Sequence, residues 1–171
     1  RKIFFFVLGV TIIFACSKPA EKKLFEEQLP EKTGIDFENK VIQSQDNHVL
    51  NYPYYFNGGG VVVVDINNDG LEDVYFSGNI VANRLYLNKG DFQFEDITEK
   101  AGVGAAQGWK TGVTMADVNQ DGWLDIYVSR SAMGDSLLRK NLLFMNNGNL
   151  TFIEKSDAFG VADNSYSSHA S

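Results

Sequence analysis

A nine-residue stretch that occurs twice constrains this chain more than any other feature. The copies occupy residues 65–73 (DINNDGLED) and 117–125 (DVNQDGWLD). Both have oxygen-bearing side chains at the first, third, fifth and ninth places and glycine at the sixth. Ca²⁺ takes six to eight oxygen ligands, so alternate residues of a binding loop turn inward while the chain bends sharply, which glycine permits. We therefore interpret both stretches as calcium loops.

The expected ligands are the side chains at these four places and the backbone carbonyl at the seventh. They are Asp65, Asn67, Asp69, the Leu71 carbonyl and Asp73 in the first loop, and Asp117, Asn119, Asp121, the Trp123 carbonyl and Asp125 in the second. Five protein oxygens within nine residues leave only one or two places for water, so we expect structural rather than catalytic calcium. A metal-free polar turn is the alternative, because Asn-Asp-Gly favours turns for local reasons.

The loops are not EF-hands. An EF-hand has a bidentate Glu at place twelve, where Phe76 and Val128 stand here. Apolar runs typical of strands flank both loops, where an EF-hand has helices. The ninth-place aspartates replace the missing Glu in this interpretation, and three carboxylates in one loop would repel one another without a cation.

The repetition extends beyond the loops and predicts the architecture. Residues 60–65 match 112–117, and residues 73–77 match 125–129, both 52 positions apart. A hairpin pattern at 84–94 matches 141–152 with an offset of 58, which places a six-residue insertion within 130–140. Four short strands per repeat at this period are typical of a β-propeller blade, whose rings have about 4–8 blades. A solenoid or a β-sandwich fits the period and the repeat fidelity less well.

The sequence therefore predicts an all-β fold, a partial propeller of about two and a half blades with about four antiparallel strands each. This domain is expected to span residues 33–171. Because a ring needs more blades, we expect the chain to be part of a longer protein.

The N-terminal region has the pattern of an export signal. Arg1 and Lys2 precede a thirteen-residue apolar run, residues 3–15, which is too short for a membrane span of about 20 residues. The run ends Ile-Phe-Ala before Cys16, the single cysteine, which resembles a bacterial lipobox and predicts lipidation of Cys16. An ordinary signal peptide or a buried strand is the alternative. Residues 16–32, rich in Lys, Glu, Pro and Gln, are interpreted as a flexible tether.

Charge and residue types limit the function. The net charge is −7, and −9 without the first fifteen residues, which argues against nucleic acid as a partner. His48 and His169 are the two histidines, and no catalytic or phosphate-binding motif is present, so no catalytic residue is assigned. Trp109, Trp123 and Tyr127 are candidates for a sugar platform, although aromatic residues beside such loops usually pack between blades.

The loops, flanked by strands and recurring in blades, resemble the FG-GAP/VCBS repeat family of calcium-binding, integrin-α-like β-propellers. Residues 55–60 and 83–88 are similar to bacterial VCBS-repeat lipoproteins, many of which end in an ASPIC/UnbV domain. The Gly-Ala-Pro of an FG-GAP repeat is absent, with residues 77–79 (SGN) and 129–131 (SRS) in its place, which favours the VCBS branch.

The resemblance implies a non-enzymatic, calcium-stabilised binding or adhesion module on an exported lipoprotein of the bacterial outer membrane or cell surface. Its partners would be the membrane, through the lipid on Cys16, and a protein or glycan of unknown identity. The alternative is the propeller of a secreted carbohydrate-active enzyme whose catalytic residues lie outside this chain.

Overall fold

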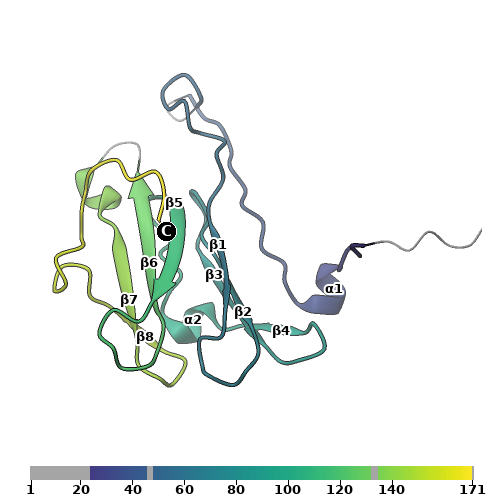
Figure 1. Cartoon of the computed structure of the whole chain (residues 1–171). Coiled ribbons are helices and arrows are strands. Elements are labelled where there is room, and N and C mark those ends of the chain that lie inside the picture. The colour runs from purple at the N-terminus through teal and green to yellow at the C-terminus, as the bar shows by residue number, and fades with distance from the viewer. Residues whose placement is uncertain (1–23, 46–47, 132–134, 171) are drawn as a thin grey trace, which may run out of the picture.

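The structure is a computed structural model that describes residues 24–45, 48–131 and 135–170. The expected signal sequence and Cys16 lie outside these residues. Two four-stranded antiparallel sheets stand side by side, each formed by strands that are consecutive in the chain (Figure 1). The first holds β1 (Val61–Val64), β2 (Asp73–Phe76), β3 (Arg84–Asn88) and β4 (Phe94–Asp96). The second holds β5 (Trp109–Ala116), β6 (Asp125–Ser131), β7 (Leu142–Asn146) and β8 (Phe152–Glu154).

Helical segments are short and lie between or beside the sheets. They are α1 (Pro30–Thr33), α2 (Thr98–Ala101) and the 3₁₀ turn η1 (Ser136–Arg139). The turn η1 lies in the stretch where the second repeat has its insertion. Within the described part of the chain, no helix is long and apolar enough to cross a membrane.

The register of the two sheets confirms the repeat. Tyr75 of β2 pairs with Val62 of β1 and Leu85 of β3, and the equivalent Tyr127 pairs with Thr114 and Leu143. The third and fourth strands of each sheet form the predicted hairpins, which turn through residues 89–93 and 147–151. The two sheets are blades of a partial β-propeller, as the sequence predicted.

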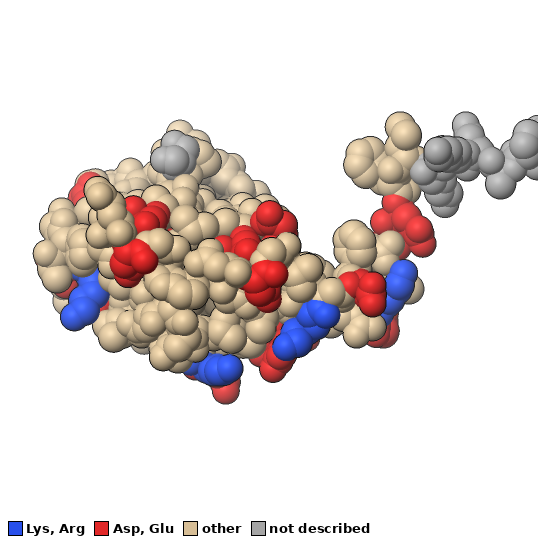
Figure 2. Space-filling view, turned by 60° about the horizontal axis from the view of Figure 1, so that its bottom comes forward, with Lys and Arg blue, Asp and Glu red and all other residues tan. Residues whose placement is uncertain are grey.

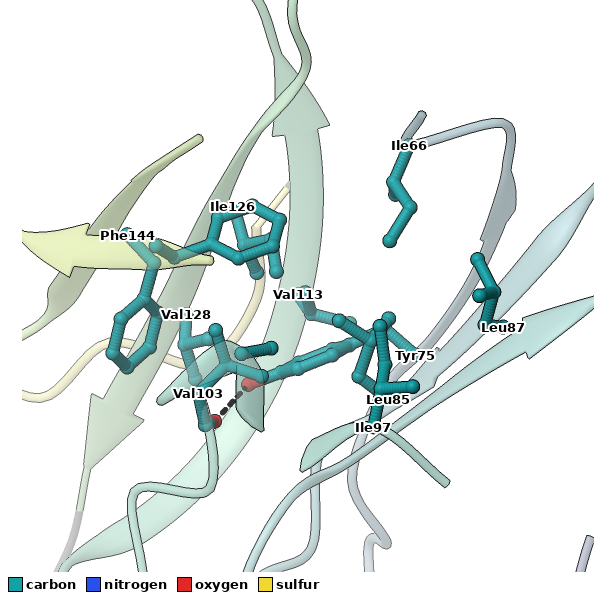
Figure 3. Close-up of a cluster of buried hydrophobic side chains, with 12 residues drawn as sticks. Ile66, Tyr75, Leu85, Leu87, Ile97, Val103, Val113, Ile126, Val128 and Phe144 are labelled. Atoms are coloured by element: carbon teal, nitrogen blue, oxygen red, sulfur yellow. Dashed lines mark hydrogen bonds between the residues drawn. The ribbon is translucent and has the colours of Figure 1, made fainter. Parts of the chain in front are cut away.

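The core lies between the two blades. Side chains alternate along strands, so β2 and β3 bury Tyr75 and Leu85 on the face that meets β5 and β6. The second blade contributes Ile126, Val128 and Phe144 from its opposite face (Figure 3). This face-to-face burial of alternate residues holds neighbouring blades together.

The first strand of each repeat is approached closely by the repeat that follows it. A Cβ added to Gly60 would lie 2.8 Å from the Val113 nitrogen, so only glycine lets β1 lie this close to β5. A Cβ added to Gly112, the equivalent glycine of the second blade, would lie 3.0 Å from the Ala170 nitrogen. The C-terminal tail therefore lies against β5 in the same way that β5 lies against the start of β1. Residues 155–170 nevertheless contain no strand.

The segment before β1 packs along the outer side of the first blade. The Asn39 amide donates to Asn79 Oδ1 at 2.7 Å, and the Asn79 backbone N–H donates back to Asn39 Oδ1 at 2.9 Å. Phe37 stacks on Phe76 of β2, with ring centroids 4.8 Å apart. These contacts cover part of the blade face that points away from the second blade.

Candidate functional site

Both nine-residue loops lie at the same end of the sheets. The first connects β1 to β2 and the second connects β5 to β6 (Figure 1). Acidic side chains gather in two groups on the face of the molecule that Figure 2 brings forward, where these connections lie. The fold thus places the two predicted sites beside one another in successive blades. The loops also touch, because Asn68 Nδ2 donates to the Gly122 carbonyl at 3.2 Å.

The first loop is wrapped around the carboxylate of its first residue. Asp65 Oδ1 accepts the backbone N–H groups of Asn67 and Asp69 at 3.3 and 3.2 Å, and Oδ2 accepts that of Gly70 at 2.7 Å. Asn68 and Gly70 both have positive φ, 59° and 86°, which produces the sharp bend. Although desolvation opposes the effect, the donated N–H groups of the loop lower the pKa of Asp65.

The second loop repeats this geometry. Asp117 Oδ1 accepts the Asp121 N–H at 3.1 Å, and Oδ2 accepts the Gly122 N–H at 2.9 Å. Gln120 and Gly122 take φ values of 61° and 88°, close to those of their counterparts. In each loop the third-place Asn donates through Nδ2 to the fifth-place Asp, at 2.8 Å in the first and 2.7 Å in the second. Two stretches that differ at four of nine places therefore fold alike.

The ninth-place aspartates are buried and close their loops. Asp73 accepts the Ile66 N–H at 3.0 Å with one oxygen and the Asn88 N–H at 2.7 Å with the other. Asp125 accepts the Val118 and Asn146 N–H groups at 3.1 and 2.8 Å.

Desolvation raises the pKa of both ninth-place carboxyls. The nearby Asp65 and Asp69 raise that of Asp73 further, and Asp117 and Asp121 do so for Asp125. The first- and fifth-place carboxylates of each loop therefore lie close enough to repel a negative charge on the ninth.

Sequence reasoning missed one member of each loop's framework, the Asn that ends the third strand of the blade. Asn88 Nδ2 donates to the Glu72 carbonyl at 2.8 Å. Asn146 Nδ2 donates to the Leu124 carbonyl at 3.2 Å and to the Ile66 carbonyl of the first loop at 2.9 Å. Their recurrence at the repeat offset of 58 was the available signal. These residues attach the hairpin of each blade to the loop.

The seventh-place residues of the loops and the aromatic residues considered for a sugar platform do not lie together in one site. Leu71 is exposed, and Trp123 lies against Gly148, where an added Cβ would come within 2.8 Å of the indole. Trp109 is buried against Tyr55, with ring centroids 4.9 Å apart. The structure therefore does not bring Trp109, Trp123 and Tyr127 together as a sugar platform, because Trp109 belongs to the opposite end of the blade and to the core.

The donor chemistry of both loops suits a hard cation, since every expected ligand is a carboxylate, amide or carbonyl oxygen. As placed, the first-, third- and fifth-place side chains accept hydrogen bonds from their own loops, and the ninth-place aspartates accept from their loops and from the hairpins. Across the residues that the structure describes, no group of three or more His, Cys, Asp or Glu side chains is arranged so that it could hold a metal ion. The loops thus offer oxygen donors along a backbone path that bends sharply at their glycines.

No catalytic constellation is centred on the histidines among the described residues. His48 Nδ1 accepts the Leu50 N–H at 3.2 Å, which fixes a local turn. A different titratable group is strongly perturbed: burial, and to a lesser extent the charge of Arg130, lower the pKa of Lys110 to about 8. Its ammonium donates to the carbonyls of Ala105 and Gly108 at 3.0 and 3.2 Å, so it fastens the turn before β5.

Comparison with known proteins agrees with the geometry of the loops. Residues 65–128 match the FG-GAP-like repeat. The matched FG-GAP-like region begins at the first residue of the first loop and ends in the strand that follows the second.

Cartilage acidic protein 1 and an integrin alpha chain are similar to parts of this chain. Cartilage acidic protein 1 of Xenopus tropicalis is 38% identical over 72 residues, which cover 42% of this chain and 11% of that protein. Integrin alpha-8 of Gallus gallus is 31% identical over 104 residues, 53% of this chain and 10% of that protein. The chain spans about a tenth of the length of the curated relatives that it matches. Together with the two blades, these matches support the FG-GAP family and a propeller-type repeat fold.

Proposed function

We propose that this chain is part of a calcium-stabilised, non-enzymatic β-propeller that serves as an extracellular binding module. The observation that carries the proposal is the recurrence of one loop geometry, with the same donor set, at the same end of two successive blades. The FG-GAP-like match and the similarity to an integrin alpha chain support an interaction module.

Each loop would hold one calcium ion with its own ligands. These are Asp65, Asn67, Asp69, the Leu71 carbonyl and Asp73 in one blade, and Asp117, Asn119, Asp121, the Trp123 carbonyl and Asp125 in the other. The ion would supply positive charge beside the ninth-place carboxyl, whose pKa is raised by burial and further by the two other aspartates of its loop. The loop residues would then fix the turn between the first two strands of each blade, while Asn88 and Asn146 tie that turn to the hairpin.

A structural role for calcium fits the surroundings of the loops better than a catalytic one. A catalytic metal needs an open position beside a substrate pocket and a group that moves protons. The neighbours of the loops are strand residues such as Val64, Val74 and Ile126. An enzymatic activity that disappears with Asp125→Asn while the melting temperature stays unchanged would contradict this role.

Thermal unfolding of the full-length protein tests the stabilising role of calcium. A ligand that binds only the folded state adds about 2.7 kcal/mol per site at a free concentration 100 times its Kd. Calcium should therefore raise the melting temperature of the wild type, and excess chelator should reverse the effect. The double variant Asp69→Ala/Asp121→Ala should respond much less, while Asp91→Ala, which removes an exposed acid from a hairpin turn, should respond like the wild type. A melting temperature independent of calcium in the wild type would refute the proposal.

We further propose that the protein is exported and held at a bacterial outer membrane or cell surface by lipid on Cys16, with residues 16–32 as the tether. The short apolar run before Cys16 supports this proposal. An ASPIC/UnbV region elsewhere in the protein belongs to the same proposal.

A further inference from the structure

A cavity of about 600 Å³ lies at the end of the blades opposite the calcium loops. Four segments far apart in the sequence form it. The segment before β1 contributes Tyr52, Tyr54 and Asn57, the start of β5 contributes Thr111, the end of β6 contributes Ser131, and the C-terminal tail contributes Tyr166 and His169. The volume lies within the roughly 300–1,000 Å³ of ligand pockets.

The walls of this pocket are fixed by contacts behind them. Tyr52 meets the buried Trp109 edge-on, with ring centroids 5.5 Å apart. Tyr55, fully buried beside the same indole, donates its hydroxyl proton to the Ile42 carbonyl at 2.8 Å. Thr111 Oγ1 donates to the Ser167 carbonyl at 2.9 Å, which holds the tail against β5. A held wall favours binding, because less conformational freedom is lost when a ligand enters.

The pocket is placed by the repeat itself. Gly59, Thr111 and His169 all line it, and they occupy equivalent positions, 52 and 58 residues apart. Each of the three residues lies near the start of the first strand position of its repeat. The pocket is therefore the point where successive blades converge, while the calcium loops lie at the other end of the same strands (Figure 1).

The side chains of the pocket are aromatic or uncharged and polar. Tyr54 and Tyr166 are 60% and 69% exposed, so their rings are accessible at the cavity. Tyr54 meets Tyr52 edge-on with ring centroids 5.8 Å apart, and the Arg139 guanidinium lies 4.9 Å from the centroid of the Tyr166 ring. Thr, Ser and Asn side chains stand between the rings, and no Asp, Glu, Lys or Arg is among the described residues that line the cavity. A phosphate, nucleotide or other charged ligand would find no side chain of opposite formal charge within this lining. The Arg139 guanidinium beside it packs on the Tyr166 ring and donates to the Asn164 carbonyl at 3.1 Å.

Neutral sugars match this chemistry. A pyranose ring has apolar C–H faces that pack on aromatic rings, and its hydroxyls both donate and accept hydrogen bonds, as Tyr, Thr, Ser and Asn side chains do. We propose that this pocket binds a neutral oligosaccharide. The inference rests on the proposed binding function and names both the site and the class of ligand for it.

The test is binding of the full-length protein to a defined panel of probes. The panel holds tetrasaccharides of glucan, xylan, mannan and chitin, with a heparin tetrasaccharide and a library of short peptides for comparison. Titration calorimetry with each probe is run on the wild type, on Tyr54→Ala and Tyr166→Ala, and on Phe92→Ala as a matched control. Phe92 is an equally exposed aromatic residue, 68%, in the β3–β4 turn.

At least one neutral tetrasaccharide should bind, Tyr54→Ala and Tyr166→Ala should each weaken it at least fivefold, and Phe92→Ala should leave it unchanged. The proposal is overturned if no neutral sugar binds, if only heparin or peptides bind, or if the tyrosine variants bind as the wild type does. Calcium-dependent melting is measured on the same samples. A protein that still responds to calcium but binds no sugar would refute the sugar site alone, whereas loss of the calcium response in the wild type would refute the proposed function.

Discussion

Replacing Tyr75 with phenylalanine should destabilise the protein more than the same change at Tyr127, the equivalent residue of the second blade. Tyr75 is completely buried between the two blades. Its hydroxyl donates to the Val103 carbonyl at 2.9 Å and accepts from Asn83 Nδ2 at 2.7 Å (Figure 3 draws the first bond). Burial raises the pKa of this hydroxyl, so it remains a donor throughout the pH range in which the protein is handled.

The magnitude follows from the two partners that the variant would leave behind. An unsatisfied buried donor or acceptor costs about 1–3 kcal/mol. Tyr75→Phe leaves the Val103 carbonyl and the Asn83 amide without this partner, so we expect a loss of about 2–4 kcal/mol in the free energy of unfolding. That is a large share of the roughly 5–15 kcal/mol that stabilises a typical domain.

The repeat supplies a matched control. Tyr127, the equivalent residue of the second blade, accepts from Asn141 Nδ2 at 2.9 Å, but that amide also donates to Ser167 Oγ at 3.0 Å. Tyr127→Phe should therefore cost only about 1 kcal/mol, because its partner keeps a second acceptor. Urea unfolding followed by circular dichroism, with calcium fixed, measures both variants. Equal losses for the two, or a loss below about 0.5 kcal/mol for Tyr75→Phe, would refute the reasoning.

Two further predictions concern Lys110 and Cys16. Lys110 has a pKa of about 8 in the folded protein, against about 10.4 in the unfolded chain. Between these two pH values the unfolded chain binds more protons than the folded protein. The free energy of unfolding therefore rises with pH, by at most about 1.4 kcal/mol per pH unit. Urea titrations from pH 7.5 to 9.5 should show this rise in the wild type and a smaller one in Lys110→Met; equal slopes would contradict the assignment. Metabolic labelling with a fatty-acid analogue should mark the wild type and not Cys16→Ala, and an unlabelled wild type found free outside the cell would overturn the lipid anchor.

The parts of the fold that depend on short-range patterns were predictable from the sequence. The two loops, the strands on either side and the hairpins turning near Gly90 and Gly148 all follow from local turn chemistry and alternation, and they recur at matching offsets. Repetition made these predictions stronger, because each element was seen twice.

The features that sequence reasoning missed depend on contacts between distant residues. The reciprocal bonds of Asn39 and Asn79 join residues 40 positions apart, and neither residue carries a local signal for its partner. The sequence around Trp109 carries no signal that the segment before β1 would bury this side chain. Asp73 and Asp125 were predicted as ligands, and their additional hydrogen bonds to the hairpins appear only once the blade is assembled.

The most direct test of the account is the number of calcium ions that the full-length protein binds, measured by calorimetric titration. Two structurally equivalent loops predict that Asp69→Ala and Asp121→Ala each remove one ion per chain relative to the wild type, and that the double variant removes two. Asp91→Ala should leave the number unchanged. If the wild type and the double variant bind the same number of ions, the loops are metal-free turns and the central claim is wrong.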